Sequence, residues 1–62
     1  MADYIGDALR ASQAEQTTVV LHVSGGMITG VVVRFDADCV ELRHDKGRTM
    51  VVRSHIDAIT VE

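Results

Sequence analysis

The stretch MITGVVVRF, residues 27–35, decides the fold of this chain. It is the most apolar of several β-forming segments, and Gly30 stands in its middle. Ile28, Val32 and Phe35 do not follow one alternation, so a flat strand would leave one of these side chains outside the core. A sharp bend at Gly30, with a bulge near the end of the strand, would let both halves line a small barrel.

Segments of alternating apolar and polar residues flank this strand and are separated by tight turns. In the strand expected over residues 38–44, the alternation exposes Glu41. In the strand expected over residues 48–53, it buries Met50 and Val52. With two further strands expected over 17–23 and 57–61, the chain is predicted to be mainly β, a strongly bent five-stranded antiparallel SH3-like barrel over about residues 17–62.

A helix is expected ahead of the barrel, from about residue 3 to 14. Asp3 can cap it by accepting a hydrogen bond from a free backbone N–H. Ile5 and Leu9 then fall on one face at helical spacing. Gly6 weakens such a helix by about 1 kcal/mol relative to alanine, so the helix is expected to depend on docking. The 62 residues are expected to form a single domain.

A chain this short is only marginally stable without a disulfide, a metal or a partner, because so small a domain buries only about 60% of its unfolded surface. Cys39 is the only cysteine, which excludes an internal disulfide, and the three histidines lack a paired metal-ligand spacing. Oligomerisation through exposed strand edges is therefore expected. The histidines and carboxylates form no recognisable catalytic set, so we expect no enzyme, metal or cofactor.

Two features predict a cytoplasmic location. The unpaired cysteine suits a reducing compartment. The first residues do not resemble a secretion signal, and no apolar run approaches the length of a membrane span.

Charge is segregated along the chain. The net charge of −3 disfavours indiscriminate adhesion to nucleic acid or to membranes. Even so, four of the six basic residues lie in one stretch of eleven residues that contains a single acid. This cluster is either a phosphate-binding patch or a solvated hairpin whose arginines pair with nearby carboxylates. Its members are Arg43, Lys46, Arg48 and Arg53.

Several short motifs follow one another at a characteristic spacing. DALR closes the expected helix at residues 7–10. Gly25, after Ser24, precedes Gly30 by five positions, and Phe35 and Asp36 follow Gly30 by five and six. Near the end of the chain, residues 51–59 read VVRSHIDAI. In order and spacing, these motifs resemble the Sm and Hfq-like RNA-binding proteins over nearly the whole chain.

The resemblance implies a homo-oligomeric ring, usually of six subunits in Hfq, with seven as the alternative. In such a ring the fourth strand of one subunit pairs with the fifth strand of the next. It also implies binding of single-stranded RNA, in post-transcriptional regulation. The residues expected to seal the subunit interface are Val51, Val52, Ile59 and Val61.

The residues that bind RNA in this family are matched only in part. His55 falls on the pore histidine of the family, but Ser54 replaces the lysine before it. Ala37 and Asp38 stand where Hfq has a glutamine and an aromatic residue that stacks on uracil. The RNA-binding candidates are therefore His55, Ser54, Arg53, Asp38 and Ala37 on the pore side, and Arg10, Arg43, Lys46 and Arg48 on a basic hairpin or rim.

Three functions remain open from the sequence. The first is a ring that binds single-stranded RNA through a diverged pore site. The second is a ring that acts as a protein-interaction scaffold, because residues 53–60 are similar to the closing segment of cyanobacterial Hfq-like proteins, which also lack the standard RNA residues. The third is a small SH3-like barrel that acts as a monomeric or dimeric adaptor. Whichever function holds, the alternative to a pore role for His55 is that it fills a tight turn.

Overall fold

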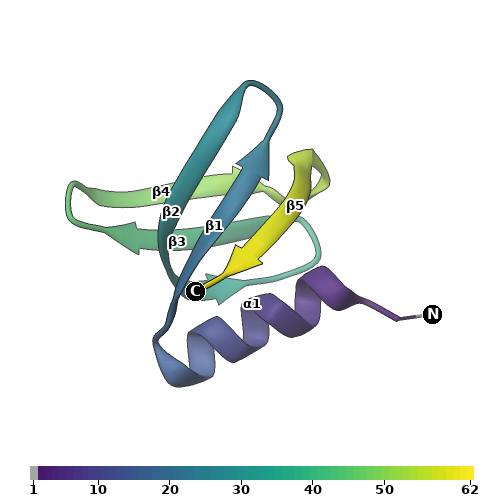
Figure 1. The fold of residues 1–62 in the computed structure, drawn as a ribbon, viewed down its shortest axis with the longest axis horizontal. Coiled ribbons are helices and arrows are strands. Elements are labelled where there is room, and N and C mark those ends of the chain that lie inside the picture. The colour runs from purple at the N-terminus through teal and green to yellow at the C-terminus, as the bar shows by residue number, and fades with distance from the viewer. Residues whose placement is uncertain (1) are drawn as a thin grey trace.

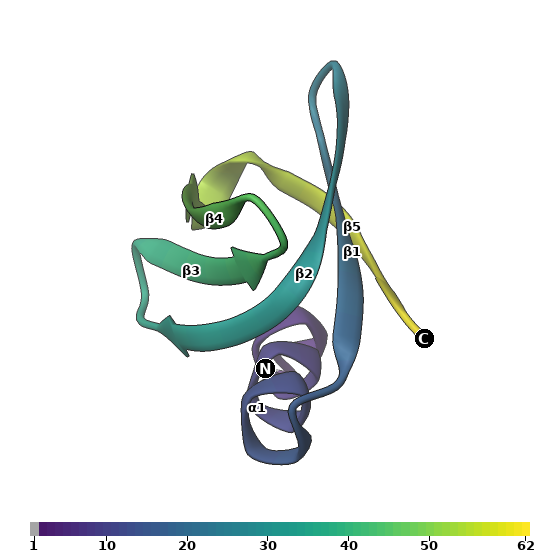
Figure 2. The ribbon, with the colours of Figure 1, turned by 90° about the vertical axis from the view of Figure 1, so that its left-hand side faces the viewer.

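A computed structural model describes residues 2–62 as a helix followed by five strands and a short 3₁₀ turn. The strands form one antiparallel sheet in the order β4-β3-β2-β1-β5. The sheet is strongly bent, and the helix lies against β2 and β5 at one end of it (Figures 1 and 2). The elements are α1 (Tyr4–Glu15), β1 (Thr18–Val23), β2 (Gly26–Phe35), β3 (Cys39–His44), β4 (Gly47–Val52), η1 (Arg53–His55) and β5 (Ile56–Val61).

The predicted fold is confirmed, with the qualification that the sheet stays open. Among residues 2–62, β4 and β5 pair with β3 and β1 respectively but not with each other. Both therefore remain edge strands, each with one row of backbone groups unpaired. No helix in this part of the chain is long and apolar enough to cross a membrane.

Strand β2 carries the bend. Its first half pairs with β1 and its second half with β3, so one strand belongs to both walls of the sheet (Figure 2). The predicted bulge is present, as a shift in register between Val32 and Arg34. A Cβ atom added to Gly30 would lie only 2.7 Å from the backbone oxygen of Arg43, so glycine allows the close approach of β2 to β3.

The core lies between the walls of the sheet and the helix. Ser12 connects them, because its hydroxyl donates to the backbone oxygen of Thr17 at 2.6 Å and accepts from the backbone N–H of Val32 at 3.2 Å. Phe35 packs against the core from a half-buried position. No larger side chain than leucine is fully buried among the described residues. The buried apolar residues are Leu9, Val19, Leu21, Val32, Val40, Leu42, Val51 and Ile56.

Two predictions about burial were wrong. Met50 and Val52 are 57% and 47% exposed, whereas Val51 between them is buried. The register explains this, because Val51 lies opposite the buried Val40 and must face the same side of the sheet. Glu41 was expected to be exposed but is only 7% exposed, since two arginine side chains cover its carboxylate.

The substitution Gly30→Ala is expected to lower the free energy of unfolding by about 1–3 kcal/mol, because its methyl group would force β2 and β3 apart. Gly26→Ala is the matched control, since a Cβ there meets nothing within 4 Å. It should change stability by less than about 0.5 kcal/mol. Chemical denaturation at one fixed protein concentration measures both. Equal effects of the two substitutions would show that the bend does not depend on Gly30.

Candidate nucleic-acid interface and subunit edges

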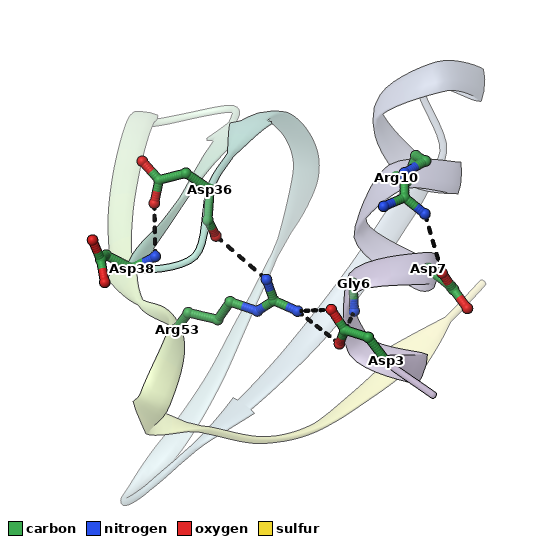
Figure 3. Close-up of polar contacts among 7 residues, drawn as sticks. All are labelled: Asp3, Gly6, Asp7, Arg10, Asp36, Asp38 and Arg53. Atoms are coloured by element: carbon green, nitrogen blue, oxygen red, sulfur yellow. Dashed lines mark hydrogen bonds and ion pairs between the residues drawn. The ribbon is translucent and has the colours of Figure 1, made fainter. Parts of the chain in front are cut away.

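Arg53 joins three parts of the chain. Its Nη2 contacts both carboxylate oxygens of Asp3 at 2.7 and 2.6 Å, which links it to the start of α1 (Figure 3). Its Nη1 donates to the backbone oxygen of Asp36 at 3.4 Å, and its backbone N–H donates to that of Asp38 at 2.7 Å. The turn between β4 and β5 is thereby held to the helix and to the turn between β2 and β3.

Gly6 makes room for this contact. Asp3 caps α1 as predicted, by accepting from the backbone N–H of Gly6 at 2.9 Å. A Cβ atom on Gly6 would collide with the Asp3 carboxylate and lie 2.9 Å from Nη2 of Arg53. The glycine that weakens the helix is therefore the residue that lets Arg53 reach the capping carboxylate.

The carboxylates around Arg53 are held in their charged form. The Arg53 guanidinium, and after it the Gly6 N–H, lower the pKa of Asp3 below its usual value. The backbone N–H groups of Cys39 and Asp38 lower the pKa of Asp36 in the same way, by donating to its Oδ1. The guanidinium of Arg53, the arginine among the pore-side candidates, is thus paired with a neighbouring carboxylate.

The structure divides the pore-side candidates. Ala37 and Asp38 are exposed in the turn between β2 and β3, and Asp38 contacts Arg53 directly. Ser54 and His55 are exposed in η1. His55 lines an apolar cleft of about 390 Å³ between the β1–β2 hairpin and the edge strand β4, together with Val23, Ser24, Ile28, Met50, Val51 and Val52.

The candidate interface residues lie on the two edge strands but differ in exposure. Val52 on β4 and Val61 on β5 are 47% and 57% exposed, and Ile59 is half-buried. Val51 packs into the core of its own subunit. Only 6% of Val51 is exposed, at the cleft, whereas the adjacent Met50 and Val52 expose far more apolar surface.

The basic candidates also separate into two groups. Arg43, Lys46 and Arg48 share the β3–β4 hairpin, whereas Arg10 lies on α1 and pairs with Asp7 at 3.1 Å. Arg48 pairs with Glu41 at 3.1 Å. Such a pair is what a solvated hairpin, the alternative to a phosphate-binding patch, predicts for this arginine. Within residues 2–62, no group of three or more histidine, cysteine, aspartate or glutamate side chains could hold a metal ion.

Sequence reasoning missed two contacts on this surface. The role of Arg34, whose Nε lies 2.8 Å from Oε1 of Glu41, depends on the bulge that aligns β2 with β3. Asp3 and Arg53 are fifty positions apart, so no local pattern indicates their contact. The one local sign of this contact was Gly6, three residues after the capping Asp3, because a glycine there leaves room for another side chain.

Asp3→Asn should lower the melting temperature more than Asp7→Asn does. Asparagine still caps a helix, so the first substitution removes mainly the charge that faces Arg53. Asp7→Asn removes an equal charge from an exposed pair on the same helix turn. Thermal denaturation followed by circular dichroism compares the two variants at pH 7.

The stabilising effect of Asp3 should also depend on pH in one direction. Because the pKa of Asp3 is lowered on folding, its contribution is fully present above the usual value of 3.8 and is lost as the pH falls through the lower folded-state pKa. The difference between wild type and Asp3→Asn should therefore shrink at acid pH. A difference that persists at pH 2 would contradict an ion pair as its cause.

Comparisons with known proteins give one kind of match. No protein-family model and no curated protein matches the sequence. Among solved structures, the chain is similar to the 1.55 Å crystal structure of the pleiotropic translational regulator Hfq, with 26% sequence identity and a TM-score of 0.87. The match covers 100% of this chain and 98% of the other. With its helix, its strand order and its open, bent sheet, the protein therefore has the Hfq-like Sm fold.

Proposed function

We propose that this chain assembles into a homo-oligomeric ring that binds single-stranded RNA and acts in post-transcriptional regulation in the cytoplasm. The observation that carries the proposal is the similarity to Hfq, a translational regulator, along the full length of both chains. Six subunits are expected, with seven as the alternative. The two open edges of the sheet support assembly, and the basic residues of the β3–β4 hairpin support binding of a polyanion.

Assembly is supported by the chemistry of the two edges. Strands β4 and β5 lie at opposite ends of the sheet, and the sequence contains no proline that would block pairing at either edge. Met50 and Val52 on β4, and Val61 on β5, expose apolar surface beside these edges. An edge of one subunit that pairs with a different edge of the next makes a heterologous contact, which closes into a ring when the rotation between subunits completes a circle.

The cleft beside β4 fits the same assembly. Its walls are mostly apolar and include the outward-facing Met50 and Val52, and it lies where the sheet fails to close. In the proposed ring, the β5 strand of the neighbouring subunit covers this cleft. Burying such side chains stabilises association by about 25 cal/mol for each Å² of apolar surface removed from water.

The pore-side residues would contribute less to RNA binding than in a ring with the full family pattern. Asp38 brings a carboxylate where an aromatic residue would add about 1–3 kcal/mol per stacked base. The Arg53 guanidinium is occupied by Asp3. Binding through the pore is therefore proposed to be weak, with His55, Ser54 and Ala37 as the remaining contacts.

A ring that serves as a protein-interaction scaffold is the second candidate. The observation that favours it is the acidic character of the surface around Arg53. The lowered pKa values of Asp3 and Asp36 keep both carboxylates charged, and they oppose a phosphate backbone. In that case the same ring would bind a protein and not RNA.

Native mass spectrometry should find the wild-type chain as a closed oligomer of six or seven subunits at micromolar concentration. Val52→Asp should yield monomers, because a carboxylate buried without a partner costs more than about 2 kcal/mol at each interface. Met27→Asp is the control, since Met27 is 69% exposed but lies on β2, which is not an edge strand. A wild-type monomer under these conditions would exclude the ring.

RNA binding is tested by fluorescence titration of the assembled protein with short U-rich and A-rich oligoribonucleotides. We expect binding with Kd below about 100 μM that weakens steeply as salt is raised, because phosphate contacts release counterions. A preference for A-rich over U-rich RNA would agree with the weakened pore site. The absence of salt-sensitive binding to either RNA would exclude RNA as the ligand and favour the scaffold.

A further inference from the structure

The ion pair between Asp3 and Arg53 has an outer and an inner member. The Asp3 side chain is 60% exposed, whereas the Arg53 side chain is only 20% exposed. Both carboxylate oxygens of Asp3 contact the same atom of Arg53, Nη2, at 2.7 and 2.6 Å. An anion from solution that binds this nitrogen therefore competes with Asp3 for it.

Arg53 is also held by contacts that do not involve Asp3. Its backbone N–H donates to the backbone oxygen of Asp38 at 2.7 Å, and its Nη1 donates to that of Asp36 at 3.4 Å. Within residues 2–62 it forms no second ion pair. If Asp3 moves away, the guanidinium therefore stays at the turn between β4 and β5, with its charge available to another anion.

Asp3 is held by the weakest part of α1. Apart from the ion pair, its contacts are with the first turn of the helix, where its carboxylate accepts from the N–H of Gly6 and its backbone oxygen accepts from the N–H of Asp7, both at 2.9 Å. Glycine lowers the helix propensity of this turn. Because Leu9 and Ser12 are buried further along α1, the first turn can open while the rest of the helix stays docked.

We propose that Asp3 is an autoinhibitory carboxylate, which occupies Arg53 until a backbone phosphate of single-stranded RNA displaces it. In the open form the first turn of α1 is frayed, and Nη2 of Arg53 donates to the phosphate. Phosphate suits this exchange because a guanidinium binds it with the same paired donors that bind a carboxylate. Since only the open fraction offers Arg53, the closed form lowers the apparent affinity. This inference rests on the proposed function and adds a control to its pore side.

The first test compares Asp3→Asn with Asp7→Asn in the assembled protein, with fluorescein-labelled oligouridylate as the probe. Asparagine still caps a helix, so Asp3→Asn removes mainly the charge that faces Arg53. It should lower Kd at least about fivefold and steepen the slope of log Kd against log salt by about 1, for one added phosphate contact. Asp7→Asn removes an equal charge from an exposed pair on the same turn and should change Kd by less than about twofold. Equal effects of the two substitutions would overturn the inference.

Gly6→Ala separates displacement of Asp3 from a change in net charge. The added Cβ would collide with the Asp3 carboxylate and lie 2.9 Å from Nη2 of Arg53. Both groups are the ends of flexible side chains, so they can part while the fold is kept. Gly6→Ala should therefore lower Kd for oligouridylate at least about twofold by raising the open fraction. Gly26→Ala, where a Cβ meets nothing within 4 Å, is the matched control and should leave Kd unchanged.

Arg53→Gln assigns the gain in affinity to one guanidinium. When Arg53 is already glutamine, adding Asp3→Asn should change Kd by less than about twofold, because the two substitutions act on one contact. Circular dichroism at the assay temperature verifies that each variant is folded. A fivefold gain that persists without the Arg53 guanidinium would overturn the inference.

Hydrogen exchange followed by NMR tests the opening itself in the wild-type protein. Saturating oligouridylate should speed exchange at the amides of Gly6 and Asp7, which bond to Asp3 in the closed form. The amide of Val32, which donates to the Ser12 hydroxyl in the core, is the internal reference and should not exchange faster. Unchanged or slower exchange at Gly6 and Asp7 would contradict displacement of Asp3.

The remaining outcomes distinguish this inference from the proposed function. If the wild type binds RNA and neither Asp3→Asn nor Gly6→Ala strengthens binding, Asp3 is not autoinhibitory, although the protein still binds RNA. If the wild type and both variants bind neither oligouridylate nor oligoadenylate, the inference and the proposed function fail together. Binding of oligouridylate that appears only in the two variants would support the inference and identify Asp3 as the cause of weak binding in the wild type.

Discussion

The close contact between β2 and β3 at Gly30 is the constraint on which the rest of the structure depends. Only a residue without a side chain allows the backbone of β2 to pass the Arg43 carbonyl and continue into the second wall of the sheet. With one strand shared by both walls, eight small apolar residues suffice to fill the core. The same bend carries β4 and β5 to opposite ends of the sheet, where each is left with an open edge.

The open edges explain why apolar and charged residues are distributed as they are. A subunit of this size gains little from its own core, and part of its apolar surface remains outside, on Met50, Val52 and Val61. These residues lie on the edge strands, where another copy of the chain can cover them. The basic residues of the hairpin lie on β3, on β4 and in the turn between them.

Residue alternation predicted the elements well and the orientation of β4 poorly. Strand periodicity, the bend at Gly30 and the helix cap at Asp3 are local properties, and all three were found as expected. In β4, however, three apolar residues follow one another from Met50 to Val52, so alternation cannot say which of them faces the core. The pairing of β3 with β4 decides that, and it depends on the geometry of the turn between them.

Prediction of the candidate site was limited for a related reason. The hairpin cations were recognisable because they are close in sequence, but one of the two arginines that cover Glu41, Arg34, is brought beside it by the bulge in β2. The contact between Asp3 and Arg53 spans nearly the whole chain. Interactions of this kind follow from the completed fold and leave no trace in local composition.

The contact between Asp3 and Arg53 has a geometric consequence for the proposed ring. Arg53 belongs to the short turn that joins the two edge strands, so the helix is fastened to the corner between them (Figure 3). In the proposed ring, the angle at that corner would govern how far each subunit is rotated relative to the next. In that ring the helix would act as a brace on the angle, and the number of subunits would depend in part on Asp3, a residue that belongs to neither edge strand.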